Sequence, residues 1–336
     1  MPIQQIDTTT QTEIIQNLTE KLKACYVFPD IADQICKRLG KHLKDGEYTA
    51  ITDGELLAQT LTKHLQAVNQ DEHLRVIWYP EPLPDHKGSM LHNQERLLEF
   101  RQRAKQENYG LHKVERLPGN VGYLDIRYFY RPSWGSGDTA AAAMNFLANM
   151  NALIVDLRRC RGGNPGMVAL ISSYLFDGEP IHLNSLYWRA ENLTQQYWTL
   201  PYVPGKRFAG KPIYVLTGKE TFSAGEEFAY NLKTLRRATL VGETTGGGAH
   251  PGSPYRLHSH FEVFIPTGRT INPITNSNWE GSGVVPDISV AREQALKVAY
   301  RMALESIIEN TGEPASRPLG LLLKEAQAAL DETENS

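Results

Sequence analysis

A serine stands at a predicted turn between a strand and a helix. The apolar run from Pro212 to Gly218 predicts a buried strand, and a helix-like run continues to Leu232. Ser223 comes just before that helix, where backbone N–H groups point outward and favour developing negative charge. This position suits a nucleophile and its oxyanion hole. Glu226 follows three residues later, so the pair also matches a helix-capping box, and this stretch alone favours a cap because caps are far more common than nucleophiles.

Two glycine-rich loops are further candidates for ligand-binding sites. Gly162 and Gly163 lie between a predicted buried strand and a helix, where backbone N–H groups can converge on an anion. Glycines at such a place also simply permit a tight turn. The loop from Gly242 to Gly248 lacks the Lys-Ser/Thr of a P-loop and opens no clear helix. We therefore do not expect nucleotide binding.

Three ionisable residues could assist a nucleophile. His73 begins a predicted strand beside two acidic residues, and His250 ends the second glycine loop. Glu280 stands beside Trp279 and a Gly-Ser-Gly turn. A lone histidine is usually structural and a loop carboxylate is usually solvated, so each residue by itself has an ordinary explanation.

The composition is that of a globular chain. Of 336 residues, 41% are apolar and 22% charged, which suits one large core and a smaller partner domain. The net charge of −3 gives no reason to expect nucleic acid or an acidic membrane as partner. Cys25, Cys36 and Cys160 cannot form a closed disulfide framework, and no CxxC or His/Cys cluster indicates zinc. We expect neither a metal nor a cofactor.

No targeting or membrane segment is visible. The first lysine is Lys21, no apolar h-region follows the N-terminus, and no apolar run approaches the roughly 18 residues of a membrane span. The chain as written is therefore expected to be cytoplasmic, or periplasmic or secreted if a leader has been removed.

The periodicity of apolar residues predicts a helical beginning. Ile14, Leu18, Leu22 and Cys25 share one helical face, a second amphipathic helix covers residues 31–43, and a third follows a capping box over 52–55. A strand over 71–79 and a polar helix over 93–107 come next. The first three helices predict a small bundle.

From Tyr109 onward strands and helices alternate, which is typical of an α/β core. Residues 118–120 form a hairpin turn, and Asn164 with Pro165 predicts a helix start. The predicted strands cover 111–117, 121–127, 153–157, 238–241 and 263–266, and the predicted helices 140–150, 167–176, 291–310 and 319–330. We expect an N-terminal helical domain (1–75), a connecting segment (76–112), an α/β core (113–312) and a C-terminal helix (313–336).

In their order along the chain and in their residues, these motifs resemble those of the C-terminal-processing (tail-specific) serine peptidases, especially the branch with the repeats of interphotoreceptor retinoid-binding protein. The matching stretches, spread over roughly residues 10–310, are Tyr26–Pro29, Asp71–Leu74, Leu117–Leu124, Asp156–Arg158 with Gly162 and Gly163, Phe222–Ala229, Val241–Pro251 and Gly283–Asp287. The resemblance implies a crotonase-like (Clp protease-like) α/β core with an N-terminal helical bundle.

This chain departs from the tail-specific enzymes in two ways. Too few residues separate Pro80 from Lys113 for the PDZ domain that those enzymes usually carry. Where they have the lysine of a Ser-Lys dyad, this chain has Gly248, so that mechanism is excluded at the matching position. The more distantly related tricorn core protease uses a serine with a histidine and a glutamate, and His73 and Glu280 occupy similar places.

The resemblance thus implies Ser223 as nucleophile, His73 as base and Glu280 as its partner, with His250 as the alternative base. The backbone N–H of Ala224 and that of Gly162 or Gly163 would form the oxyanion hole.

Two functions remain open. The first is a serine peptidase for short or unfolded peptides, bound in extended form near Gly246, Gly247 and Gly248. The second is a non-catalytic module that binds retinoid-like or fatty-acid-like ligands on the same fold, because fold does not determine function. The aromatic stretch over 187–202 suits an apolar pocket, although such residues are more often core. The sequence predicts no oligomeric state.

Overall fold

The computed structural model describes residues 6–83, 94–311 and 316–335, and their packing divides the chain into two compact units. Unit 1 combines the described part of Met1–Phe100 with Ser185–Gln195 and Gly248–Ile271. Unit 2 consists of the described part of Arg101–Asn184, Gln196–Gly247 and Asn272–Ser336. The predicted domain boundaries differ from this division, because they placed residues 185–195 and 248–271 in the α/β core.

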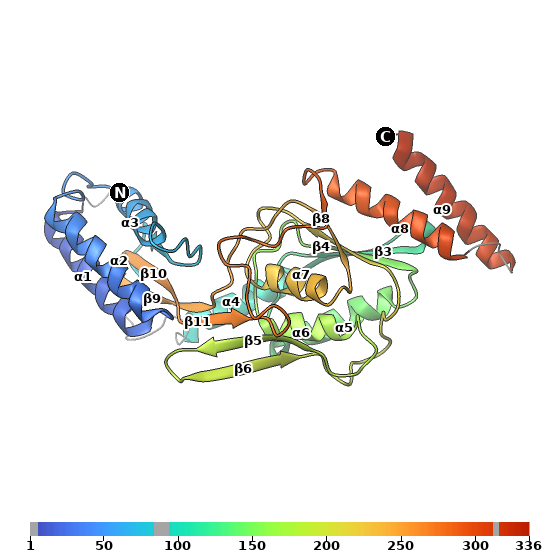
Figure 1. Cartoon of the computed structure of the whole chain (residues 1–336), viewed down its shortest axis with the longest axis horizontal. Coiled ribbons are helices and arrows are strands. Elements are labelled where there is room, and N and C mark those ends of the chain that lie inside the picture. Colours follow the sequence, from blue (N-terminus) through green and yellow to red (C-terminus); the bar gives the residue numbers. More distant parts are fainter. Residues whose placement is uncertain (1–5, 84–93, 312–315, 336) are drawn as a thin grey trace. The chain divides into compact units, whose positions relative to one another are not determined.

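Unit 1 is three helices packed on a three-stranded antiparallel sheet (Figure 1). The helices are α1 (Thr8–Cys25), α2 (Pro29–Lys44) and α3 (Gly54–Gln66), and the sheet order is β1 (Arg75–Trp78), β10 (Phe261–Pro266), β9 (Gly252–His258). The predicted helices are therefore present, but they are not a free-standing bundle. Because β10 pairs with β1 along residues 75–78, it joins residues far apart in the sequence into one unit.

Local sequence explains where these helices begin and what they bury. The α1 face predicted from Ile14, Leu18 and Leu22 is fully buried. The predicted capping box over 52–55 is shifted by one residue, because Asp53 rather than Thr52 accepts the N–H of Leu56, at 2.8 Å.

The centre of unit 2 is a six-stranded sheet that is parallel except at one edge. Its order is β12 (Ile288–Ser289), β8 (Thr239–Gly242), β7 (Ile213–Thr217), β4 (Ala152–Asp156), β3 (Val121–Ile126) and β2 (Leu111–Leu117). Only β2 runs antiparallel, joined to β3 by the predicted hairpin. All residues of β4 and β7 are buried, as expected for parallel strands covered on both faces. The predicted α/β core is confirmed.

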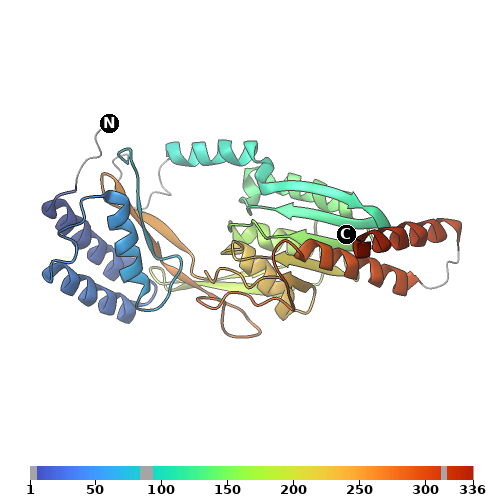
Figure 2. The same ribbon diagram turned by 90° about the horizontal axis from the view of Figure 1, so that it is seen from above.

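Helices cover this sheet. One face packs against α8 (Ala295–Thr311), whose Ala295, Ala299 and Ala303 are fully buried and allow a close approach. Beside α8 lies α9 (Arg317–Asn335) (Figure 2). The other helices of unit 2 are α5 (Ser136–Leu147), α6 (Pro165–Ser173) and α7 (Ala224–Thr234), and α4 (Gln94–Gln106) has residues in both units. A third sheet has the order β11 (Gly268–Ile271), β5 (His182–Trp188), β6 (Leu193–Trp198), and its strands also include residues of both units.

The start of α6 confirms the helix signal read from the sequence. Asn164 is the N-cap, its side chain accepts the N–H of Gly166 at 3.0 Å, and Pro165 is the first helical residue. This helix start matters for the site, because Gly162 and Gly163 immediately precede it.

Candidate active site

Ser223 occupies a strained turn between β7 and α7. Its backbone angles are φ 53° and ψ −119°, a region that residues with a side chain rarely adopt. An ordinary N-cap residue has extended backbone angles instead. A serine on a sharp, strained strand-to-helix turn is the arrangement of a nucleophile elbow, which exposes the hydroxyl at the carboxyl end of a buried strand. The side chain is half-buried.

Glu226 forms the predicted capping box with Ser223, but it does more than cap the helix. Its Oε2 accepts the N–H of Ser223 at 2.9 Å, and its Oε1 accepts the hydroxyl of Thr245 and the N–H of Gly247, both at 2.6 Å. The carboxylate is fully buried. Glu226 therefore fastens the serine turn to the glycine loop.

The first glycine loop lies directly against the serine. A Cβ atom added at Gly162, whose φ is +116°, would stand 2.9 Å from Cβ and 3.4 Å from Oγ of Ser223. The N–H of Phe222 donates to the carbonyl of Cys160 at 2.9 Å, which holds the two loops side by side. Only a residue without a side chain fits between them.

The backbone N–H groups near the serine differ in what they contact. The thiol of Cys160 lies just before Gly162 in this loop and is fully buried. Burial raises the pKa of that thiol to about 12, so Cys160 is no nucleophile. Within the described ranges, the N–H groups of Gly163 and Ala224 have no hydrogen-bond acceptor. These groups are therefore available to a ligand.

The turn that carries Glu280 packs on the second glycine loop within unit 2. Gly281 donates its N–H to the carbonyl of Gly247 at 2.8 Å, and Val284 donates its N–H to the hydroxyl of Thr245 at 2.7 Å. Glu280 itself is half-buried. Through Thr245 and Gly247, this turn is linked to Glu226 and hence to Ser223.

Both candidate bases belong to unit 1, and one buried carboxylate contacts both. Oδ1 of Asp71 accepts the backbone N–H of His73 at 3.2 Å, and Oδ2 lies 3.0 Å from Nδ1 of His250. Oδ2 also accepts the hydroxyl of Tyr26 at 2.8 Å. Asp71 is fully buried. It therefore positions the backbone of one histidine and the ring of the other.

The ring of His73 is buried and packs against Phe264, with 5.7 Å between ring centroids. Burial lowers the pKa of His73 to about 4, and Arg75 and His250 lower it further, while Asp71 opposes the shift. The imidazole is consequently neutral at pH 7. Sequence predicted that His73 begins a strand, but it lies in the turn before β1, which starts at Arg75.

The predicted site residues thus fall into two groups. Unit 2 brings together Ser223, Ala224, Gly162, Gly163, Gly246 and Gly247, with Glu280 next to this group, whereas His73, His250 and Gly248 belong to unit 1. The sequence interpretation missed the parts played by Asp71, Thr245 and, beyond capping, Glu226. The available signals were the acidic residue two positions before His73 and the glutamate three positions after Ser223.

Comparison with family models gives the identity of the fold. The model of peptidase family S41 matches residues 120–290, and the model of the N-terminal domain of peptidase S41 in eukaryotic IRBP, the interphotoreceptor retinoid-binding protein, matches residues 7–107. The chain belongs to peptidase family S41. This S41 peptidase is a serine-type hydrolase with peptide or protein substrates, as the motifs predicted. Among the described residues, none of its helices combines the length and apolar character that a bilayer span requires.

Solved structures share the fold at low sequence identity. A lipoprotein from Streptococcus agalactiae aligns with a TM-score of 0.55 at 15% identity, over 87% of this chain and 96% of that one. The photosystem II D1 C-terminal processing protease aligns at 0.50 and 14% identity, over 84% and 93%. The tricorn protease aligns at 0.52 and 14% identity, over 95% of this chain but 37% of its own. The core of the S41 peptidase is thus crotonase-like (Clp protease-like), as expected.

Proposed function

We propose that this S41 peptidase cleaves short or unfolded peptides through attack by Ser223 on the carbonyl carbon of a peptide bond. The observation that carries the proposal is the backbone of Ser223, at φ 53° and ψ −119°, with Gly162 packed against its side chain. Such a conformation costs on the order of 1–3 kcal/mol and persists mainly where function requires it.

The oxyanion hole is assigned to the backbone N–H of Ala224 and that of Gly162 or Gly163. Ala224 directly follows the nucleophile at the start of α7, where the helix dipole also favours negative charge. Gly162 and Gly163 both precede α6 in the loop that packs against Ser223. Each such donor contributes roughly 3–4 kcal/mol to the transition state.

The proposed base is His73. Burial lowers the pKa of His73 to about 4, so the ring is in the neutral form that accepts a proton, although it is a weaker base than an imidazole that titrates near the working pH. As Oγ of Ser223 forms its bond to the carbonyl carbon, His73 takes the hydroxyl proton and then gives it to the leaving amine. In the second half of the reaction His73 takes a proton from water, the resulting hydroxide bonds to the acyl carbon, and the bond to Oγ of Ser223 breaks as His73 returns the proton to Oγ, which releases the carboxylic acid product. Glu280 would accept a hydrogen bond from the second ring nitrogen and stabilise the imidazolium.

One observation favours the alternative base, His250. Its Nδ1 lies 3.0 Å from the buried carboxylate of Asp71, which is how a carboxylate orients the histidine of a Ser-His-Asp triad. A Ser223–His250–Asp71 mechanism is thus the second candidate for the same reaction. Single substitutions of the two histidines distinguish the candidates.

The substrate is proposed to bind in extended form beside the second glycine loop. Gly246 is exposed, and a Cβ there would stand 2.8 Å from the ring of Phe222, so a side chain would crowd the serine turn. Small residues let a peptide backbone approach closely. Without a PDZ domain to recruit protein tails, we expect short peptides and unfolded chains to be cleaved and tightly folded proteins to be spared.

The first test is labelling with a fluorophosphonate probe, which reacts with activated serines. We expect the wild type to be labelled and Ser223→Ala to remain unlabelled, while Ser289→Ala, which changes an exposed serine, behaves as the wild type. In peptide cleavage, Ser223→Ala and His73→Ala should each lower kcat by about 10⁴, and the double change should cost little more.

Two outcomes would change the assignment. If His73→Ala retains turnover and His250→Ala abolishes it, His250 is the base. If the wild type neither reacts with the probe nor cleaves peptides, the proposal fails and the fold acts as a module for apolar ligands. Against that module, Trp198 and Tyr202 of the aromatic stretch are 42% and 76% exposed and do not line a closed pocket.

A further inference from the structure

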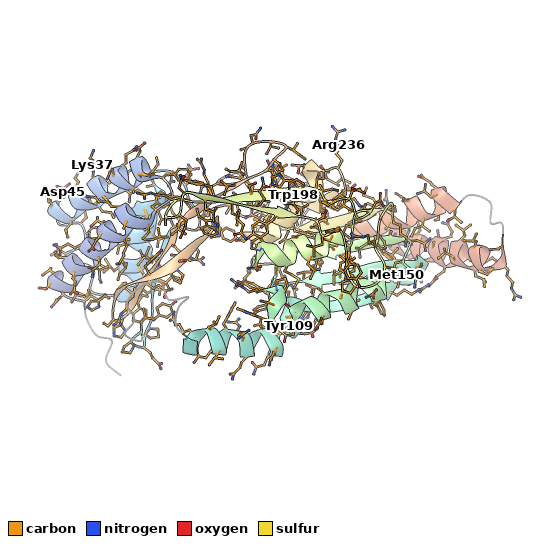
Figure 3. All side chains as sticks on the ribbon, turned by 90° about the horizontal axis from the view of Figure 1, so that it is seen from below. Lys37, Asp45, Tyr109, Met150, Trp198 and Arg236 are labelled. Atoms are coloured by element: carbon orange, nitrogen blue, oxygen red, sulfur yellow. The ribbon has the colours of Figure 1, made fainter. Side chains whose placement is uncertain are left out.

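Unit 1 contains a cluster of three metal-ligating side chains outside the proposed active site. His42 lies in the last turn of α2, Glu47 lies in the segment that joins α2 to α3, and His64 lies in α3. One ligand atom from each residue lies within 4.8 Å of the other two. Figure 3 labels Lys37 of α2 and Asp45, the residue that follows the last residue of this helix. Three elements thus bring two imidazoles and a carboxylate together.

The distances are close to those of a metal site. Nδ1 of His42 lies 2.7 Å from Oε1 of Glu47, but the two atoms are not aligned as a hydrogen bond. In a tetrahedral zinc site with bonds of about 2.1 Å, neighbouring ligand atoms stand about 3.4 Å apart. Binding an ion would therefore increase the distance between Nδ1 of His42 and Oε1 of Glu47 by less than about 1 Å. The rings of His42 and His64, whose centroids now lie 4.0 Å apart in a stacked arrangement, would have to turn.

The cluster also has basic neighbours. The positive charges of Arg38, Lys41 and Lys63 act on it and would weaken its affinity for a cation.

A second residue supports the orientation of His64. The hydroxyl of Tyr48, which is buried, lies 2.8 Å from Nδ1 of His64. When Nδ1–H of His64 donates to that hydroxyl, the lone pair of Nε2 is left for a metal. Metal-binding histidines usually donate their other ring N–H in this way.

We propose that His42, Glu47 and His64 bind one divalent transition-metal ion, best matched by zinc, with water completing its coordination. Imidazole and carboxylate form the His2Glu ligand set that zinc accepts, and the side chain of Glu47, 46% exposed, leaves an open approach. The bound ion would tie the end of α2 to α3 and stabilise unit 1. This departs from the expectation of no metal, because His42 and His64 are far apart in the sequence.

The test is a zinc titration of the full chain after treatment with a chelator. Isothermal titration calorimetry should show one equivalent bound at this site, and thermal unfolding should shift upward with zinc concentration by mass action. Cobalt(II) should give the visible absorption of tetrahedral coordination. Magnesium should have no effect, because it prefers oxygen ligands.

Variants locate the site. Glu47→Gln should weaken zinc binding about tenfold or more, and the double change H42A/H64A should remove one equivalent and the zinc-dependent rise in Tm. His112→Ala, which changes an exposed histidine of β2, is the matched control and should bind as the wild type. Circular dichroism of the zinc-free variants shows that they are folded. The proposal is overturned if H42A/H64A binds the same number of zinc ions, or if zinc neither binds nor stabilises the wild type.

Discussion

The N–H of Ser223 donates to the carboxylate of Glu226 at 2.9 Å, although the serine has the strained backbone of a nucleophile rather than that of a helix cap. The same carboxylate accepts the N–H of Gly247 at 2.6 Å. One buried side chain therefore supports both the proposed nucleophile and the loop proposed to bind the peptide.

Replacing Glu226 should impair catalysis without removing any reacting group. In Glu226→Gln one oxygen must serve the donors that two oxygens serve now, and the new NH2 group faces a donor. We expect kcat to fall by about 10² and the free energy of unfolding to fall by roughly 1–3 kcal/mol. Peptide kinetics and urea unfolding measure both. Glu227→Gln, one position further along α7, is the matched control, and equal losses in the two variants would contradict this role.

The strained backbone of Ser223 predicts that glycine at this position gives a more stable protein than alanine. Ser223→Gly and Ser223→Ala should both be inactive, but glycine tolerates φ 53° and ψ −119° whereas alanine keeps the strain. The glycine variant should therefore be more stable than the alanine variant by roughly 1–2 kcal/mol. Denaturant unfolding of the two inactive proteins provides the measurement. Equal stabilities would mean that the turn is not strained in solution.

Glu227 should make stability depend on pH. Burial raises its pKa to about 7, while the unfolded chain ionises it near its ordinary value of 4.5. Between these values the folded state binds more protons than the unfolded state, so this residue lowers stability as pH rises from about 4.5 to 7. Glu227→Gln should match the wild type near pH 4.5 and exceed it at pH 8, by up to the order of 3 kcal/mol. Thermal unfolding at both pH values is the test, and a gap independent of pH would refute the assignment.

Gly162→Ala should damage the site through steric crowding and backbone strain. The new Cβ would stand 2.9 Å from Cβ of Ser223 at a backbone φ of +116°, which disfavours any side chain. We expect both the labelling rate and the Tm to fall. Gly40→Ala is the control, because a Cβ at this helical position meets nothing within 4 Å. That change should raise stability by about 0.5–1 kcal/mol and leave peptide cleavage unchanged.

Asp71→Asn separates the two candidate bases. The amide oxygen can still accept the backbone N–H of His73, but it no longer holds the ring of His250 as a carboxylate does. If His73 is the base, as proposed, kcat should fall by no more than about tenfold. A loss near 10⁴, the size seen when a triad carboxylate is changed to its amide, would instead identify His250. Circular dichroism and the Tm show whether the variant is folded.

Much of the framework follows from local sequence. The buried strands around β4 and β7, the hairpin at residues 118–120 and the start of α6 at Asn164 depend on neighbouring residues, so periodicity and turn chemistry predict them. Ser223 could be placed between a strand and a helix for the same reason. The family could be predicted because its motifs are continuous stretches of sequence.

Other features depend on residues far apart in the chain. Glu226 hydrogen-bonds to Thr245 and Gly247, which lie 19 and 21 residues further along the chain. Asp71 contacts His250, 179 residues further along, and β1 pairs with β10. Local sequence patterns do not predict such long-range contacts. For this reason the sequence of this stretch could not show whether Ser223 is a helix cap or a nucleophile. Burial likewise is a property of the packed structure, so the neutral state of His73 and the raised pKa of Glu227 were decided only by tertiary structure.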